Sequence, residues 1–105
     1  MSKRLAGFEE LVLLTVASLS DAAYGVTVQE RLEAETRAPI SIGAVYAVLD
    51  RLERKGYVRS WLGEATATRG GRRKRLFKVT APGIAALREM DKIRAKLWSP
   101  APRPA

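Results

Sequence analysis

The residues best suited to chemistry form a group of cations between Arg69 and Lys78. Six of these ten residues are Arg or Lys, and none is Asp or Glu. Because like charges repel one another, such a segment suggests a polyanionic partner. In DNA, the phosphate backbone and the narrow minor groove attract such cations. The alternative is a solvated loop on a basic protein. We predict that the DNA contacts of this segment come from Arg69, Arg72, Arg73 and Lys74.

A helix suited to a DNA groove precedes these cations. Ser41 suits its N-cap, and Gly56 suits the left-handed residue that ends it. Apolar residues spaced by 3, 4 and 3 predict its buried stripe: Ile42, Val45, Leu49 and Leu52. Small residues on the outer face let the helix approach DNA closely, and the free N-terminal amides favour a phosphate. The DNA contacts that we predict here are Ser41, Gly43, Ala44, Tyr46, Ala47 and Arg51.

Two of these predictions have an alternative. Tyr46 donates its hydroxyl to a phosphate or touches a base edge, or else its ring packs on the hairpin that follows. Arg51 lies near the C-terminal end of its helix, where a cation is favourable in any case. It contacts DNA, or it pairs with a nearby acid, such as one on the second helix.

The segments around this helix predict a mainly α fold with a small β hairpin. Apolar residues of the first helix, at residues 7–19, form a broad face of Phe8, Leu11, Val12, Leu14 and Leu19. A second helix spans residues 25–36 and stops before Pro39. Strands at residues 58–62 and 75–79 flank the basic loop and predict a hairpin. Alternation along the second strand can turn either Arg75 or Lys78 away from DNA.

A last helix follows Thr80, its N-cap, and extends to Trp98. Its apolar stripe is longer than three short helices and a hairpin can cover. We therefore predict a two-fold dimer through this helix, with Trp98 packing on the partner's first helix. The dimerisation residues are Ile84, Leu87, Met90, Ile93, Leu97 and Trp98. The predicted organisation is a winged helix-turn-helix domain over residues 1–80, a C-terminal dimerisation helix over 81–98 and a disordered tail over 99–105.

The net charge of +8 is unevenly distributed along the 105 residues. Residues 1–40 carry a net charge of −2, residues 41–80 of +7 and residues 81–105 of +3. The positive charge is therefore concentrated in the helix and hairpin of the middle segment. This is the pattern of a nucleic-acid-binding surface rather than of a uniformly basic protein.

Several classes of protein are excluded by what the sequence lacks. It has no Cys and no His, which excludes disulfides and sites built on thiolate or imidazole. No cluster of acids suits a hard cation, and no Gly-rich loop opens a helix within a βαβ unit. We expect no catalytic activity and no cofactor. No apolar run approaches the length of a membrane span, and the N-terminus lacks a signal-peptide pattern, so we expect a cytoplasmic protein without membrane contact.

Five short motifs in order resemble the PadR family of bacterial transcriptional regulators, over about residues 8–90. The motifs are Tyr24-Gly25, Ser41-Ile42-Gly43 with Tyr46, the run Asp50-Arg51-Leu52-Glu53-Arg54-Lys55-Gly56, the basic Gly71-Arg72-Arg73-Lys74-Arg75 and Thr80-x-x-Gly83. The second hairpin strand departs from the family, because Leu76-Phe77 replaces its paired tyrosines and their hydroxyls. The short C-terminal part resembles the compact branch, in which the last helix builds the dimer.

The resemblance implies a homodimeric repressor that binds a palindromic operator in double-stranded DNA and is often released by a small molecule. In some relatives, a tryptophan of the last helix from each subunit flanks a flat aromatic ligand. Arg94 falls at that place here, so we do not assign this role to Trp98. A small aromatic effector remains one partner that the resemblance suggests.

We therefore predict a sequence-specific DNA-binding transcriptional regulator with a winged helix-turn-helix and a C-terminal dimerisation helix. The alternative is a winged-helix protein–protein interaction module whose basic hairpin binds an acidic partner, and RNA binding is a third possibility. Salt-sensitive binding that prefers a palindromic duplex distinguishes the first function from both others.

Overall fold

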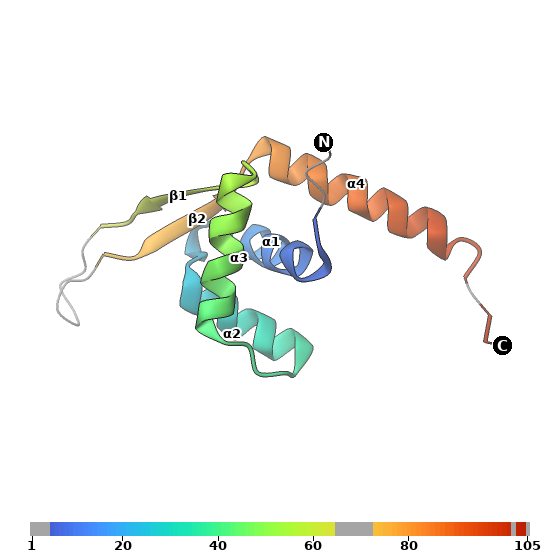
Figure 1. The fold of residues 1–105 in the computed structure, drawn as a ribbon, viewed down its shortest axis with the longest axis horizontal. Coiled ribbons are helices and arrows are strands. Elements are labelled where there is room, and N and C mark those ends of the chain that lie inside the picture. Colours follow the sequence, from blue (N-terminus) through green and yellow to red (C-terminus); the bar gives the residue numbers. More distant parts are fainter. Residues whose placement is uncertain (1–4, 65–72, 102, 105) are drawn as a thin grey trace.

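The computed structural model describes residues 5–64, 73–101, 103 and 104. Three helices form the body of the molecule, a hairpin projects from it on one side, and a long helix leaves it on the other (Figure 1). The elements are α1 (Gly7–Leu19), a 3₁₀ turn (Ser20–Ala22), α2 (Gly25–Thr36), α3 (Ile42–Arg54), β1 (Val58–Leu62), β2 (Arg75–Val79) and α4 (Ala81–Trp98). The predicted fold class and helix and strand positions are confirmed. Among the described residues, no helix is both long and apolar enough to cross a membrane.

The core lies where α1, α2 and α3 meet and is closed on one side by β2. Its largest fully buried side chains are Phe77, Leu13, Leu49, Leu52, Val12, Val16, Val28 and Val45. Aliphatic residues at helical spacing therefore provide most of the stabilising burial, at about 25 cal/mol per Å² of apolar area.

The buried stripe of α3 differs from the predicted one at two positions, because Val48 takes the place of Ile42. Ile42 is 37% exposed, whereas Val48 is only 4% exposed. At about 100° per residue, Val48 falls in the same arc as Val45 and Leu52. Ile42 lies close to Leu49 around the helix, but it is the first residue of the helix, where neighbouring helices leave it partly uncovered. The prediction that Ile42 belongs to the core was wrong.

The apolar face predicted for α1 is confirmed at Phe8, Val12 and Leu19 and was wrong at two other positions. Leu11 and Leu14 are exposed, and the side chains buried instead include two acids, Glu9 and Glu10. The apolar residues alone could not reveal this, because each acid is buried against a cation from a helix distant in sequence.

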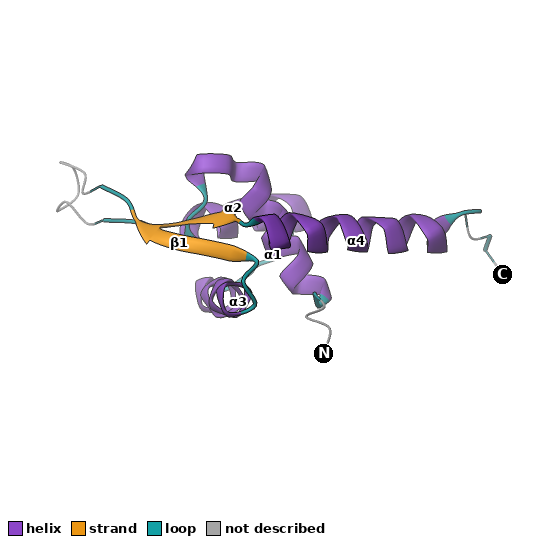
Figure 2. Cartoon of the chain, turned by 90° about the horizontal axis from the view of Figure 1, so that it is seen from above, coloured by secondary structure: helices purple, strands orange, loops and turns teal. Residues whose placement is uncertain are grey.

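The hairpin is held on the body of the molecule by backbone pairing. Its antiparallel strands pair from Val58 opposite Val79 to Leu62 opposite Arg75. The amide of Phe77 donates to the carbonyl of Ala23 at 2.9 Å, and Tyr24 bridges Leu76. Seen from above, the hairpin lies between α2 and α3 and extends beyond both (Figure 2).

The start of α4 packs tightly against the turn that ends α3. Thr80 caps the helix by accepting from the amide of Gly83 at 3.2 Å, and its own hydroxyl donates to the carbonyl of Gly56 at 2.6 Å. A Cβ on Gly83 would stand 2.2 Å from the carbonyl oxygen of Tyr57, so glycine is required there. This contact directs α4 away from the core, and its C-terminal half extends beyond the other helices (Figure 1).

Candidate nucleic-acid interface

The outer face of α3 is uncovered along its whole length. Ser41 caps the helix, with its hydroxyl accepting from the amide of Ala44 at 3.1 Å. All the predicted contact residues on this helix are exposed: Ser41, Gly43, Ala44, Tyr46, Ala47 and Arg51. Because its first two turns carry mainly small side chains, the backbone of the helix can approach a flat or grooved partner closely.

The alternative in which the Tyr46 ring packs on the hairpin was wrong. The ring packs over Gly25, the first residue of α2, rather than on the hairpin. A Cβ added to Gly25 would stand 2.3 Å from Cζ of Tyr46 and 2.4 Å from its hydroxyl oxygen. Gly25 thus makes room for the ring. The ring remains 38% exposed at the edge of the outer face.

The C-terminal end of α3 is anchored on the first turn of α1. Lys55 lies 2.7 Å from Glu9, whose Oε1 also accepts from the amide of Ala6 at 2.9 Å. Burial raises the pKa of the Glu9 carboxyl, but the hydrogen bond from Ala6 and the charge of Lys55 outweigh burial and lower the pKa below its usual value. Arg51 adds a longer contact of 3.9 Å to Glu9 and stays half-exposed. Its acid partner is therefore in α1, and the expected partner on the second helix was wrong.

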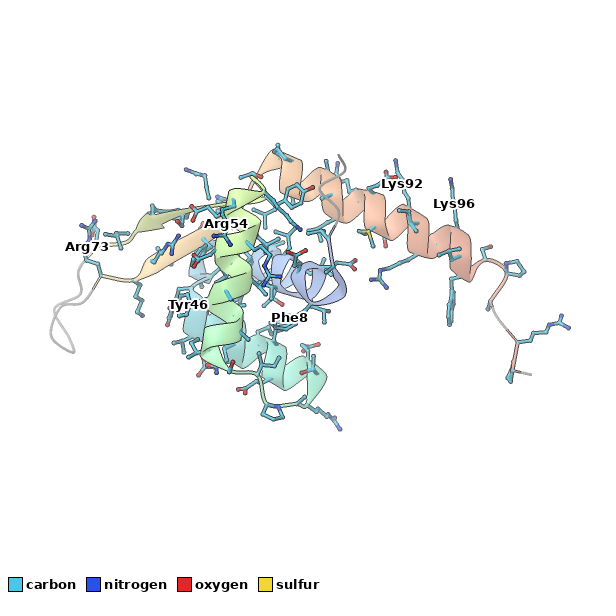
Figure 3. All side chains as sticks on the ribbon, viewed as in Figure 1. Phe8, Tyr46, Arg54, Arg73, Lys92 and Lys96 are labelled. Carbon is cyan, nitrogen blue, oxygen red and sulfur yellow. The ribbon has the colours of Figure 1, made fainter. Side chains whose placement is uncertain are left out.

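Two predicted cations stand at the base of the hairpin loop. Arg73 donates from Nε to the carbonyl of Gly63 at 2.7 Å and from Nη2 to that of Leu62 at 3.2 Å. Lys74 places its Nζ 4.4 Å from the centre of the Tyr24 ring. Both side chains are exposed, and these contacts hold them beside the loop. Figure 3 shows Arg73 on the hairpin and Tyr46 and Arg54 on α3. Arg69 and Arg72 lie outside the described residues.

The two cations of strand β2 have acidic neighbours. Arg75 pairs with Asp50 at 3.2 Å and also with Glu53, both on α3. Lys78 is half-exposed and lies 3.8 Å from Asp21. Strand alternation therefore turns Arg75 towards α3.

A second uncovered surface lies on α4. Ile84, Leu87 and Met90 are half-buried, the last two against the core. The same side of the helix then continues without cover, with Leu97 80% exposed and Trp98 66% exposed. Arg94 reaches from this half of α4 to the buried carboxylate of Glu10, with Nε 3.2 Å from Oε2 and a closer contact through Nη2. This bond, with the charge of Glu10, raises the pKa of the Arg94 guanidinium.

The described residues show no group of three or more acidic side chains placed to hold a metal ion. The candidate sites of interaction are thus two uncovered surfaces. The surface on α3 carries small and cationic side chains, and the surface on α4 carries apolar side chains.

The chain was compared with protein families, with curated protein sequences and with solved structures. Residues 13–89 match the model of the "Transcriptional regulator PadR-like family". No curated protein sequence matches the chain. The fold is similar to that of a PadR-like transcription factor from Bacteroides fragilis, at 22% identity with a TM-score of 0.73, covering 86% of this chain and 82% of that one.

Two further solved structures have the same fold. A PadR-like transcriptional regulator from Bacillus cereus is 18% identical with a TM-score of 0.71, over 88% of this chain and 84% of that one. A PadR family transcriptional regulator from Eggerthella lenta is 27% identical with a TM-score of 0.66, over 85% and 75% of the two chains.

Proposed function

Because the chain belongs to the PadR-like family of transcriptional regulators, which are not enzymes, we propose that it regulates transcription by binding a palindromic DNA operator as a homodimer. In this proposal α3 enters the major groove, the hairpin cations contact the backbone or minor groove, and α4 joins the two subunits. The single observation that carries the proposal is the outer face of α3, which is uncovered, capped and lined by small side chains.

The chemistry of that face suits DNA better than a protein partner. Gly43, Ala44 and Ala47 offer little side-chain area for a protein interface, but they allow the helix to sit deep in a groove. The free amides of the first turn favour a phosphate. Tyr46 stands at the edge of this face with its ring supported by Gly25, where its hydroxyl can donate to a phosphate.

The hairpin cations would supply the second set of contacts. Arg73 and Lys74 are exposed beside the loop, and cations in such a position neutralise phosphates and release condensed counterions. Arg69 and Arg72, predicted from the sequence, would add to the same contact.

The uncovered apolar residues of α4 support assembly with a second copy of the chain. A two-fold dimer would place the two α3 helices about 34 Å apart, one turn of DNA. The operator would then be a pseudo-palindrome whose half-sites lie about 10 base pairs apart, centre to centre. Repression, and release by a small aromatic ligand, are further parts of the proposal that rest on family membership alone.

Selection of bound duplexes from a random pool tests this function directly. We expect a two-fold symmetric site, with affinity that falls steeply as salt rises. In a dimer, Arg73→Gln with Lys74→Gln removes four phosphate contacts, which should flatten the slope of log affinity against log salt by about 3–4 units.

The matched control removes two other exposed cations, Lys92 and Lys96. Figure 3 places both on α4, away from the hairpin, so Lys92→Gln with Lys96→Gln should leave the slope unchanged. If the hairpin variant keeps the wild-type slope, or if no symmetric duplex is selected, the protein-interaction function is favoured instead.

A further inference from the structure

One cation of the hairpin is used quite differently from its neighbours. The guanidinium of Arg75 donates from Nη1 to Asp50 at 3.2 Å, from Nη2 to Glu53 and from Nε to the hydroxyl of Ser60 at 3.1 Å. Each of its three nitrogens is therefore engaged within the protein. The guanidinium carbon also lies 5.0 Å from the ring centre of Phe77, which is fully buried.

Glu53 completes the connection from the side of α3. Its Oε2 accepts from the amide of Ser60 at 3.1 Å and from the hydroxyl of Ser60 at 2.7 Å. One carboxylate of α3 thus bonds both strands of the hairpin, β1 through Ser60 and β2 through Arg75. Arg75 adds Asp50, one helical turn before Glu53.

These contacts connect both strands of the hairpin to α3. The hairpin is also held at Leu76 by the bridge to Tyr24, at the buried Phe77 by its amide bond to Ala23, and at Lys74 by its contact with the Tyr24 ring. Beyond these contacts the loop end of the hairpin projects away from the helices (Figure 1). A rotation of the hairpin at its base therefore moves Arg73 relative to α3.

We propose that Arg75 is a positioning residue for DNA binding, which holds the hairpin at the angle to α3 where both elements reach the same duplex. This inference rests on the proposed function, because it assigns Arg75 a role in bringing the two DNA contacts into register. A preorganised pair of contacts binds more tightly than the same contacts on a mobile hairpin, since less conformational freedom is lost on binding.

A direct phosphate contact by Arg75 is disfavoured by its surroundings. Two carboxylates lie beside one guanidinium, so the local charge is negative. That environment repels a phosphate, in contrast to the surroundings of Arg73, which donates only to carbonyl oxygens. The two arginines stand two residues apart and are predicted to affect DNA binding through different physical effects.

The first test compares operator affinity and salt dependence for Arg75→Lys, Arg75→Gln and Arg73→Gln. Arg75→Lys keeps the charge but cannot reach three acceptors. Both Arg75→Lys and Arg75→Gln should therefore weaken operator binding about tenfold, because a preorganised geometry is lost. The slope of log affinity against log salt should stay at the wild-type value in both variants of Arg75. Arg73→Gln should flatten it by about 1.8 units in a dimer. The inference is overturned if Arg75→Lys keeps wild-type affinity, or if Arg75→Gln flattens the slope as Arg73→Gln does.

A second variant separates positioning from simple masking of negative charge. Combining Arg75→Gln with Asp50→Asn removes one of the exposed acids together with its partner. If Arg75 positions the hairpin, the double variant stays about as weak as Arg75→Gln. Recovery of wild-type affinity would mean that Arg75 only neutralises Asp50, and would overturn the inference.

A third measurement needs no DNA. The chain has no cysteine, so Glu64→Cys at the hairpin and Ala34→Cys on α2 give two spin labels per subunit. The labelled chain is mixed with excess unlabelled chain, so that each measured distance joins two labels of one subunit. The distribution of label-to-label distances should be narrow with Arg75 present and broad in Arg75→Gln. An unchanged distribution would overturn the inference. Failure of the proposed function would show differently, as absence of duplex binding by the wild-type chain.

Discussion

The two helices α3 and α4 are held in the same way and leave opposite kinds of surface uncovered. Each is anchored on the first turn of α1 by its own ion pair, α3 through Lys55 to Glu9 and α4 through Arg94 to Glu10. The outer face of α3 carries small and cationic side chains. The free half of α4 instead presents large apolar side chains, among them Leu97 and Trp98.

The difference shows that exposure alone does not identify a binding partner. Small side chains add little to hydrophobic binding, so the face of α3 must gain affinity from charge and hydrogen bonds. On α4, burying a residue such as Leu97 stabilises a complex by about 1.5–3 kcal/mol, because apolar area leaves water. The face of α3 suits the groove of a polyanion, and the face of α4 suits another apolar surface.

The difference between the two surfaces is tested most directly by making the free half of α4 polar. Ile93→Glu with Leu97→Glu should give a folded monomer, because both residues lie beyond the part of α4 that packs on the core. Operator affinity should fall by about 10²–10⁴-fold, since the two half-sites are no longer bound by one linked unit. Sedimentation and DNA titration measure the two effects.

Lys96→Glu is the matched control, because it adds charge to the same part of α4 without replacing an apolar side chain. It should leave the dimer intact. A wild-type chain that sediments as a monomer at micromolar concentration would contradict the assignment of this surface.

The next largest effect should come from the anchor of α3. Among the described residues, Lys55→Ala leaves Arg51, at 3.9 Å, as the cationic partner of the buried Glu9 carboxylate. The free energy of unfolding should fall by about 2–3 kcal/mol, less than for a fully buried pair because Lys55 is partly exposed. Urea unfolding at fixed protein concentration measures this. Arg54→Ala, an exposed neighbour at the end of α3, should change stability by less than about 0.5 kcal/mol.

The contribution of the α3 face to operator binding can be tested by removing a single hydroxyl group. Tyr46→Phe keeps the ring on Gly25 and removes only the hydroxyl. Operator affinity should fall by about 1–2 kcal/mol if the hydroxyl makes one charge-assisted bond to a phosphate. Unfolding should be unchanged, which is why phenylalanine is a better choice here than alanine. Full retention of affinity would limit Tyr46 to a packing role.

The smallest expected effect is a pH dependence of stability from Glu9. Its pKa is lowered in the folded protein from an ordinary value of 4.5. The stabilisation is therefore fully present above pH 4.5 and is lost as the pH falls through the lower, folded pKa. Glu9→Gln should show a shallower loss of stability than the wild type over this range of pH. Parallel curves for the two proteins would contradict the assignment.

The secondary structure was predictable because its signals are local. Ser41 and Thr80 as caps, Gly56 at φ 82°, and the apolar periodicity act within one or two turns of chain. The outer face of α3 followed from the same periodicity, since what is not buried must face outward. Ile42 was placed incorrectly because coverage at a helix end depends on the neighbouring helices.

The sequence by itself therefore determined the order and bounds of the elements, the positive middle segment and the apolar excess of α4. Only the tertiary structure decided how the charged residues are used. Glu9 and Glu10 are adjacent in sequence yet hold different helices, and Arg75 differs from Arg73 by facing two acids of α3. The reason is physical: the role of a charged side chain depends on which opposite charges the fold brings near it, and those partners lie tens of residues away.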